Sequence, residues 1–350
     1  MAKQAQRICI ALGECGSKQL AAEITKGLVQ SLIENGNAGV SITVLCTPDS
    51  VPLGADSLPE ANIIRHDPAS SPTVPLEGFK GDFVPQLNSI FLNAELKIVI
   101  GELKPHHFLQ YSGLCDIVMP GLASEDSLRN HLSNRTGIAM SDIHRERVEV
   151  ANAVENLVTL GFVLDADKAP ARIAIGGMSD SLASLEDVAK RMFSKEVGKP
   201  ADIVVMSAGG IPADKSLLRA IETFPAGLAA LKRNGALIVA AECGTGHGDE
   251  EFYEWTAERK EPRHLETRLR HHFNYNGFKA AFLLRVVETH RIHLVSTIPD
   301  HYVENIFGMK AAKTVNAALQ TAQRALGSDS TISIIPDASR VVPLQVQRTP

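Results

Sequence analysis

The residues best suited to chemistry lie in one stretch, residues 98–131, which opens with an apolar run and then carries two adjacent histidines, His106 and His107. Histidine titrates near neutrality, so one of the pair can accept a proton as a base while a protonated partner donates one. Two neighbouring histidines can equally do no more than hold a loop through hydrogen bonds. The residue types alone leave both interpretations open.

The same stretch continues with the turn Ser112-Gly113, the pair Cys115-Asp116, and a predicted helix whose last turn holds His131. A neutral imidazole is a common metal ligand, so His131 is a candidate ligand, and a surface histidine at a helix end without any ligand is the alternative. Another metal could also be bound by His106, Cys115 and Asp116, with or without His107. A buried cysteine in such a loop is more often inert packing.

Two glycine-rich turns each follow a predicted strand and offer backbone amides to a ligand. The turn G-E-C-G, residues 13–16, could hold an anion at the start of a helix, or it could simply connect two elements. The turn C-G-T-G-H-G, residues 243–248, follows Glu242, and its glycines would let a ligand approach the backbone closely. Many turns of this composition bind nothing. The remaining histidines considered are predicted to be solvated or packed: His264, His271, His272, His290 and His293.

Composition narrows the function classes. The 350-residue chain is 44% hydrophobic and 21% charged with a formal net charge of -5, so it lacks the basic surplus typical of proteins that bind nucleic acid or an anionic membrane surface. Its five cysteines include no C-x-x-C pair, which favours a reducing compartment over a disulfide framework or structural zinc. No signal-peptide pattern and no apolar run near ~18 residues occurs. We expect a cytoplasmic enzyme or small-ligand binder.

The elements that position these residues alternate along the first half of the chain. A strand over 7–12, a helix over 17–34 and a strand over 40–45 predict parallel pairing with a right-handed crossover. We expect further strands at 62–65, 96–100, 161–165 and 171–176, and further helices at 84–93, 141–160 and 184–194.

The second half restarts the alternation after residue 200. We expect strands at 203–207, 236–241, 292–296 and 331–335, with helices at 214–223, 227–232, 250–258, 264–273, 278–289 and 314–326. This order predicts an α/β protein of two domains, each a mostly parallel, doubly wound sheet flanked by helices. We place the domains at 1–190 and 200–330, with 331–350 as a returning strand and tail. The carboxyl ends of parallel strands share one rim, so 209–212 and 243–248 should lie together.

The long loop resembles the signature of the nickel-dependent lactate racemase (LarA-like) family. Here K-P-H-H-F-L-Q-Y-S-G-L-C-D-I-V-M-P-G is followed by S-E-D-S-L-R-N-H, and the family pattern reads roughly E-P-H-x-F-A-G-Y-S-G-G-R-K-A-I-x-P-G and then E-T-I-x-x-N-H. In the second half, G-G-I-P-A-D-K-S-L-L-R-A-I-E is similar to G-G-x-P-L-D-x-x-x-Y-Q-x-x-K, and A-E-C-G-T-G-H-G resembles the family's glycine-rich loop.

The resemblance implies an N-terminal and a C-terminal domain with the active site between them. It implies a nickel-pincer nucleotide as cofactor and racemisation of a small 2-hydroxy acid by removal and return of the hydride at C2, with two histidines acting as alternate acid and base. His106 matches one of these histidines and His131 matches the nickel ligand. The cofactor-binding positions that the resemblance assigns are Ser112, Gly113, Asp116, Arg219 and Glu222.

Several family residues are replaced in this chain. The lysine that bonds covalently to the pincer falls on Asp116, which has no amine. The family's Tyr-Gln and Lys fall on Leu218, Arg219 and Glu222. The first strand is followed by G-E-C-G-S-K rather than D-x-T-R-P, and C-T-P-D stands where G-T-H-R, with the other acid–base histidine, is expected.

Three hypotheses follow. The chain is a divergent 2-hydroxy acid racemase or epimerase with a cofactor held non-covalently. Alternatively, it is a non-catalytic paralogue that binds a small anionic metabolite or pairs with an active homologue. In the third, it is an enzyme of altered chemistry around another metal at Cys115 and Asp116. Bound nickel with racemisation would single out the first.

Overall fold

The computed structural model describes residues 5–35, 39–50, 53, 58–81, 83–106, 110–133, 140–258, 262–271 and 274–345. The chain divides into two compact units. Unit 1 comprises residues 1–104, 111–131 and 138–192, and unit 2 comprises 105–110, 132–137 and 193–350. Each unit is described by itself below.

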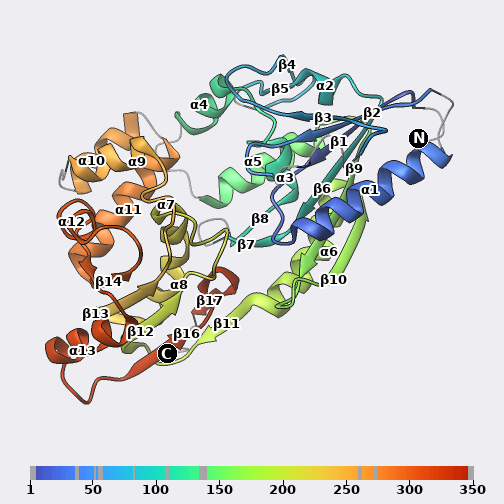
Figure 1. Cartoon of the computed structure of the whole chain (residues 1–350). Coiled ribbons are helices and arrows are strands. Elements are labelled where there is room, and N and C mark those ends of the chain that lie inside the picture. The colour runs from blue at the N-terminus through green and yellow to red at the C-terminus, as the bar shows by residue number, and fades with distance from the viewer. Residues whose placement is uncertain are drawn as a thin grey trace, which may run out of the picture. The chain divides into compact units, whose positions relative to one another are not determined.

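Unit 1 is built on a sheet of six described strands (Figure 1). All neighbours pair in parallel except the last two along the chain, which form an antiparallel edge. In spatial order the strands are β10 (Pro170–Gly176), β9 (Leu157–Leu164), β6 (Leu96–Glu102), β1 (Arg7–Leu12), β2 (Ser41–Cys46) and β3 (Asn62–Arg65).

The central strands of unit 1 are apolar on both faces because helices cover both. Ile8, Ile10 and Leu12 of β1 pack with α1 (Lys18–Asn35), whereas the intervening Cys9 and Ala11 are buried on the other face. Every residue of β6 is buried. The carboxyl ends of β1 and β6 are adjacent, since Leu12 pairs with Ile100, so the turn after β1 and the loop after β6 begin at one edge of the sheet.

Five further helices and two short ribbons lie in the described part of residues 73–193. The helices are α2 (Ser89–Leu92), α3 (Leu114–Val118), α4 (Glu125–Ser133), α5 (Met140–Asn152) and α6 (Met178–Phe193). The ribbons pair β4 (Thr73–Pro75) with β5 (Gln86–Asn88), and β7 (Lys104–His106) with β8 (Gln110–Ser112). Helix α3 packs on both β6 and α5, which brings the chemistry-bearing stretch against α5.

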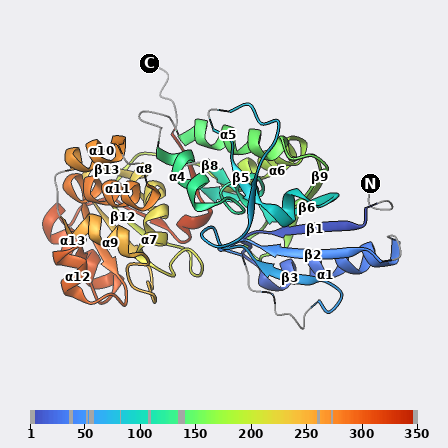
Figure 2. The ribbon, with the colours of Figure 1, turned by 90° about the horizontal axis from the view of Figure 1, so that it is seen from above.

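Unit 2 has a parallel sheet with five described strands (Figure 2). In spatial order they are β15 (Lys310–Ala311), β14 (Arg291–Val295), β13 (Leu231–Ala240), β12 (Ala201–Ser207) and β16 (Ile332–Ile335). A separate parallel pair joins β11 (Ser194–Val197) to β17 (Val342–Gln345). The helical segments are α7 (Leu217–Ala220), η2 (Ile221–Thr223), α8 (Phe224–Ala229), α9 (Glu250–Ala257), α10 (Pro262–His271), α11 (Tyr275–Thr289), α12 (Asp300–Asn305), α13 (Val315–Leu326) and η3 (Ala338–Arg340).

Alternate residues of β13 belong to two separate apolar clusters of unit 2, one on each face of the sheet. Leu237 and Val239 belong to the larger cluster, with residues of α8, α9 and α11, and Ala236 and Ile238 pack against α13 on the opposite face. Burial of both faces explains why β12 and β13 read as continuous apolar runs. The α/β prediction of two mostly parallel sheets covered by helices is therefore confirmed.

Several predicted helices are wrong in part. The helices predicted over 184–194 and 214–223 begin at Met178 and Leu217 instead. Residues 84–93 form β5 and the short α2, because the Asn88 side chain accepts the Ile90 N–H and starts the helix there. The helix predicted over 141–160 ends at Asn152, and β9 begins at Leu157 after Asn156 takes a left-handed φ of 54°. The helix predicted over 227–232 is α8, which ends at Ala229 before β13.

The segments 209–212 and 243–248 follow the adjacent strands β12 and β13, and residues 214–218, just after the first segment, contact the second. The backbone N–H groups of Leu217 and Leu218 donate to the carbonyls of Gly246 and His247, and the Cys243 N–H donates to Asp214. Among the described helices, none combines the length and apolarity needed to cross a membrane.

We predict that acid weakens unit 2 through His293. This residue lies on β14 beside Lys310 and is 2% exposed, and burial, followed by the Lys310 charge, lowers its pKa from 6.5 to about 4. The unfolded chain therefore binds a proton that the folded chain rejects between those pH values, so stability falls as pH drops through that window, by at most about 3 kcal/mol.

Urea unfolding between pH 7 and pH 4 measures this slope. His293→Gln should flatten it, and His301→Gln, an exposed histidine of the same unit, should leave it unchanged. An identical pH slope in wild type and His293→Gln would contradict the assignment.

Candidate functional site

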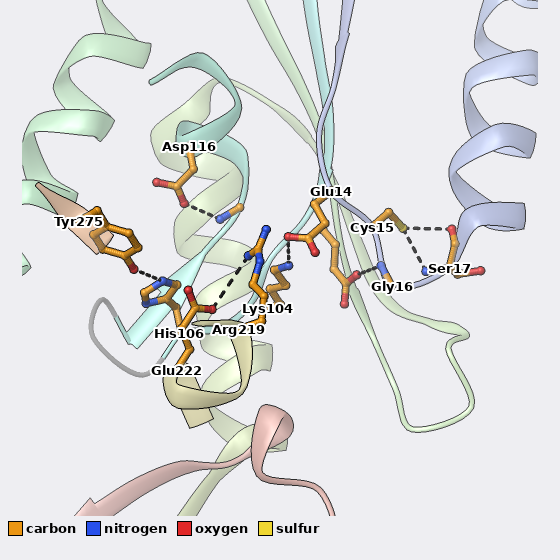
Figure 3. Close-up of polar contacts among 12 residues, drawn as sticks. Glu14, Cys15, Gly16, Ser17, Lys104, His106, Asp116, Arg219, Glu222 and Tyr275 are labelled. Atoms are coloured by element: carbon orange, nitrogen blue, oxygen red, sulfur yellow. Dashed lines mark hydrogen bonds and ion pairs between the residues drawn. The ribbon is translucent and has the colours of Figure 1, made fainter. Parts of the chain in front are cut away.

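His106, the predicted acid–base residue, ends β7 and belongs to unit 2. Its Nε2 lies 3.2 Å from the hydroxyl of Tyr275, the first residue of α11 (Figure 3). A tyrosine hydroxyl can donate to or accept from an imidazole, so Tyr275 fixes the ring whichever tautomer it adopts. His107 lies outside the described residues.

Glu222 and Arg219, two predicted cofactor-binding positions, lie near this histidine in unit 2. Arg219 belongs to α7 and Glu222 to η2, and Arg219 Nη1 is 4.0 Å from Glu222 Oε2. Lys279, which reaches in from α11, makes a short ion pair with Glu222, and its ammonium also lies 4.4 Å from the centre of the Tyr275 ring. We call His106, Arg219, Glu222, Tyr275 and Lys279 the His106 cluster.

Charge in the His106 cluster is balanced around Glu222. Burial alone would raise the pKa of this carboxyl, but Lys279, then His106 and Arg219, outweigh it and lower the pKa to about 2. Glu222 is therefore ionised at neutral pH. With Arg219 and Lys279 both cationic, the three side chains carry one net positive charge. Arg219 is the more accessible cation, with a side chain 34% exposed against 4% for Lys279, so an anion would meet Arg219 first.

Asp116, a cofactor-binding position that the resemblance assigns, lies in unit 1 near the start of α3. Its Oδ2 accepts the Gly113 N–H at 2.7 Å (Figure 3), and its Oδ1 accepts from Arg147 Nη1 of α5 at 2.8 Å. Gly113 has φ +150° and a Cβ there would lie 2.3 Å from the Glu102 carbonyl oxygen, so only glycine fits. Ser112, which precedes it at the end of β8, is buried.

His131, the predicted nickel ligand, is 1% exposed in α4 of unit 1. Its Nε2 lies 3.5 Å from Arg147 Nε, and its Nδ1 lies 3.5 Å from Glu146 Oε2. This arrangement fits the tautomer with the proton on Nδ1, because arginine can only donate. Both ring nitrogens thus face polar groups of α5, and Arg147 connects Asp116 to His131.

Two acidic side chains of unit 1, Glu14 and Glu102, lie at the turn after β1. The Gly16 N–H donates to Glu102 Oε2 at 2.7 Å, and Lys104 Nζ makes a short ion pair with Glu14 (Figure 3). The Gly16 N–H is therefore already bonded to a carboxylate and Lys104 is already paired, so the structure favours the connecting role over the anion-binding role for G-E-C-G.

The glycine-rich turn 243–248 is fixed by hydrogen bonds to neighbouring backbone of unit 2. The Cys243 and Thr245 N–H groups donate to the carbonyls of Asp214 and Lys215, and a His247 ring nitrogen lies 2.9 Å from the Asp249 carbonyl oxygen. Bonds to neighbouring backbone therefore take up these groups of C-G-T-G-H-G. Of the predicted packed or solvated histidines, His264 is exposed and His293 is buried.

The structure thus brings the predicted residues into two groups. His106, Arg219 and Glu222 meet in unit 2, and Gly113, Asp116 and His131 are connected in unit 1. Three of their partners were not predicted from the sequence: Tyr275, Lys279 and Arg147. Lys279 had a usable signal, since it is a charged residue within the apolar run F-K-A-A-F-L-L. Arg147 had none, because its helix is charged throughout.

Comparison with protein families gives matches in both halves of the chain. The lactate racemase N-terminal domain matches residues 1–141, and the lactate racemase C-terminal domain matches residues 197–342. The chain is 31% identical over 306 residues to a lactate racemase of Thermoanaerobacterium thermosaccharolyticum, a match that covers 83% of this chain and 71% of the relative. It is 27% identical over 275 residues to a lactate racemase of Lactiplantibacillus plantarum, covering 73% of this chain and 63% of the relative.

Solved structures are similar in fold. The lactate racemase apoprotein from Thermoanaerobacterium thermosaccharolyticum superposes with a TM-score of 0.85 at 25% identity, covering 98% of this chain and 88% of that chain. A protein from Thermotoga maritima gives a TM-score of 0.67 at 15% identity, covering 97% and 94%, and supports the fold alone.

We predict that Arg147→Met destabilises unit 1 by about 3 kcal/mol, because it leaves the largely buried Asp116 carboxylate without its cation. The two side chains are 10% and 17% exposed. Arg145→Met is the matched control on the same helix, since the Arg145 side chain is 70% exposed and its ion pairs contribute little. Urea unfolding compares the variants, and equal stability of the two would contradict this assignment.

Proposed function

We propose that this chain, which belongs to the lactate racemase family, binds a small 2-hydroxy acid at the His106 cluster. We further propose that it does so without a lysine-tethered nickel cofactor. The observation that carries this proposal is the position of Arg147. Its guanidinium pairs with Asp116, where the family's lysine would stand, and also faces His131 Nε2.

The His106 cluster has the charge that a small carboxylate needs. In the family pattern one lysine stands where this chain has Glu222. Here Lys279 neutralises Glu222, and Arg219, in place of a glutamine, supplies a second cation. In this chain the three side chains together carry one net positive charge. We assign Arg219 to the carboxylate of the ligand, since a guanidinium matches a carboxylate in a bidentate way. We assign His106, oriented by Tyr275, to the 2-hydroxyl.

The residues of unit 1 do not fit a tethered nickel-pincer nucleotide. Asp116 has no amine for the covalent bond, and its carboxylate pairs with Arg147. His131 is buried with both ring nitrogens facing Arg147 and Glu146, so a metal would have to displace one of these contacts. At the β1 turn, the Gly16 N–H already donates to the Glu102 carboxylate, and Lys104 is already paired with Glu14. We therefore derive no reaction step through this group.

A second candidate function is 2-hydroxy acid racemisation or epimerisation with the cofactor held non-covalently. Retention of His106 and His131, together with 31% identity to a lactate racemase over 83% of the chain, favours it. It requires Arg147 to release His131 when the cofactor enters.

Ligand binding is tested by thermal shift and calorimetry with D-lactate, L-lactate and larger 2-hydroxy acids. We expect at least one to raise the melting temperature of wild type, and Arg219→Met to weaken its affinity by about 10- to 100-fold, the value of a hydrogen bond to a charged group. Arg324→Met, which removes an exposed arginine of α13, is the control and should bind normally. Undiminished affinity of Arg219→Met would contradict the assignment of the carboxylate.

The cofactor assignment is tested by intact-mass measurement of protein made in a host that synthesises the pincer nucleotide. We expect the mass of the unmodified chain, because no amine stands at position 116. A nucleotide adduct would overturn the proposal. Stoichiometric nickel without an adduct, combined with racemisation that His106→Gln abolishes, would establish the second candidate instead.

A further inference from the structure

Three side chains with metal-ligand atoms converge beside α3 in unit 1. They are Cys115 and Asp116 of α3 and His144 of α5, and their ligand atoms all lie within 4.8 Å of one another. The three come from two helices that pack together, so the grouping results from tertiary structure rather than from a local sequence motif.

The His144 ring is unusual within this group. Its Nδ1 is buried and, among the described residues, has no hydrogen-bond partner. A buried ring nitrogen without a partner costs free energy, and a bound cation would remove that cost. His144 also lies three residues before Arg147, so both side chains project from one side of α5.

The surroundings of Asp116 match those of a metal-binding carboxylate. The Gly113 N–H and Arg147 Nη1 each bond to one of its oxygens and fix its orientation. Metal-ligating carboxylates are usually held by such outer contacts, and each oxygen keeps a lone pair for the cation. The Asp116 side chain is 17% exposed and His144 is only partly buried, so these two ligand residues contact solvent, whereas Cys115 lies buried behind them.

The donor set departs from the family pattern to which the sequence was compared. The pattern of the family carries R-K where this chain carries Cys115 and Asp116. Two cations that would repel a metal are thus replaced by a thiol and a carboxylate. A thiolate and an imidazole favour Zn²⁺ or Co²⁺ over the hard cations Mg²⁺ and Ca²⁺, which take oxygen ligands.

We infer that Cys115, Asp116 and His144 form a binding site for a thiophilic divalent cation, Zn²⁺ being the best fit, with water as the fourth ligand. On binding, the Cys115 thiol loses its proton to solvent as the sulfur–metal bond forms, and no oxidation or reduction occurs. Arg147 remains paired with Asp116 as an outer contact. The inference does not depend on ligand binding at the His106 cluster of unit 2, although Asp116 and Arg147 also enter the part of the proposed function that concerns the tethered cofactor.

Titration of chelator-treated protein with Co²⁺ under reducing, anaerobic conditions tests the site. We expect one equivalent to bind with a thiolate-to-cobalt charge-transfer band and tetrahedral d–d absorption, and Zn²⁺ to displace it. Cys115→Ser should remove the charge-transfer band. His144→Gln should weaken binding by ~100-fold or more, since even outer-contact mutations cost 10- to 100-fold in affinity.

Two variants serve as matched controls. Cys46→Ser removes another buried cysteine of unit 1, and His301→Gln removes an exposed histidine, and both should bind Co²⁺ as wild type does. If Cys115→Ser does not fold, as judged by circular dichroism, His144→Gln carries the test. The inference would be overturned if wild type showed no thiolate-to-cobalt band, or if Cys115→Ser kept that band. It would also be overturned if His144→Gln bound Co²⁺ with the affinity of wild type.

Discussion

The ion pair between Asp116 and Arg147 joins α3 to α5 within unit 1. Both side chains are largely buried, and each charge is tolerable only because the other is present. The same arginine faces His131, and the same helix carries His144. The position of α5 therefore decides what His131 and Asp116 can bind.

Unit 2 contains a parallel case at Glu222. The Glu222 carboxylate is met by Lys279 from α11. In both units a largely buried carboxylate at a position that the resemblance assigns to a lysine pairs with a cation from a helix distant in sequence. Isolated buried charges would be expelled or neutralised, so the pairs explain how these substitutions persist in a folded chain. The two outcomes differ: unit 2 keeps one net positive charge near His106, whereas unit 1 loses the amine that a covalent tether requires.

The sequence predicted the alternation of strands and helices well, because buried parallel strands such as β1, β6 and β13 are continuous apolar runs. It failed where local signals were mixed. Residues 84–93 were predicted as a helix, but Pro85 and the capping Asn88 divide them between β5 and α2. The helix predicted to reach residue 160 ends at Asn152, and β9 follows from Leu157. The charged, helix-like residues before Asn152 hid the change to the β-branched residues of β9.

The candidate site was predictable only in part. His106, Asp116, His131, Arg219 and Glu222 were found because a motif marks them. Their partners, Tyr275, Lys279 and Arg147, were not, because contacts over 169, 57 and 31 positions depend on how helices pack. The roles assigned to the motif residues remain proposals, as do the domain limits drawn from the sequence.

The most direct test of the account is a double-mutant cycle between Asp116→Asn and Arg147→Met, measured by urea unfolding with a chelator present. The account predicts a coupling free energy of about 2 kcal/mol or more, because each single variant leaves the other charge buried and the double variant does not. Coupling within about 0.5 kcal/mol of zero, the usual value for independent sites, would contradict it.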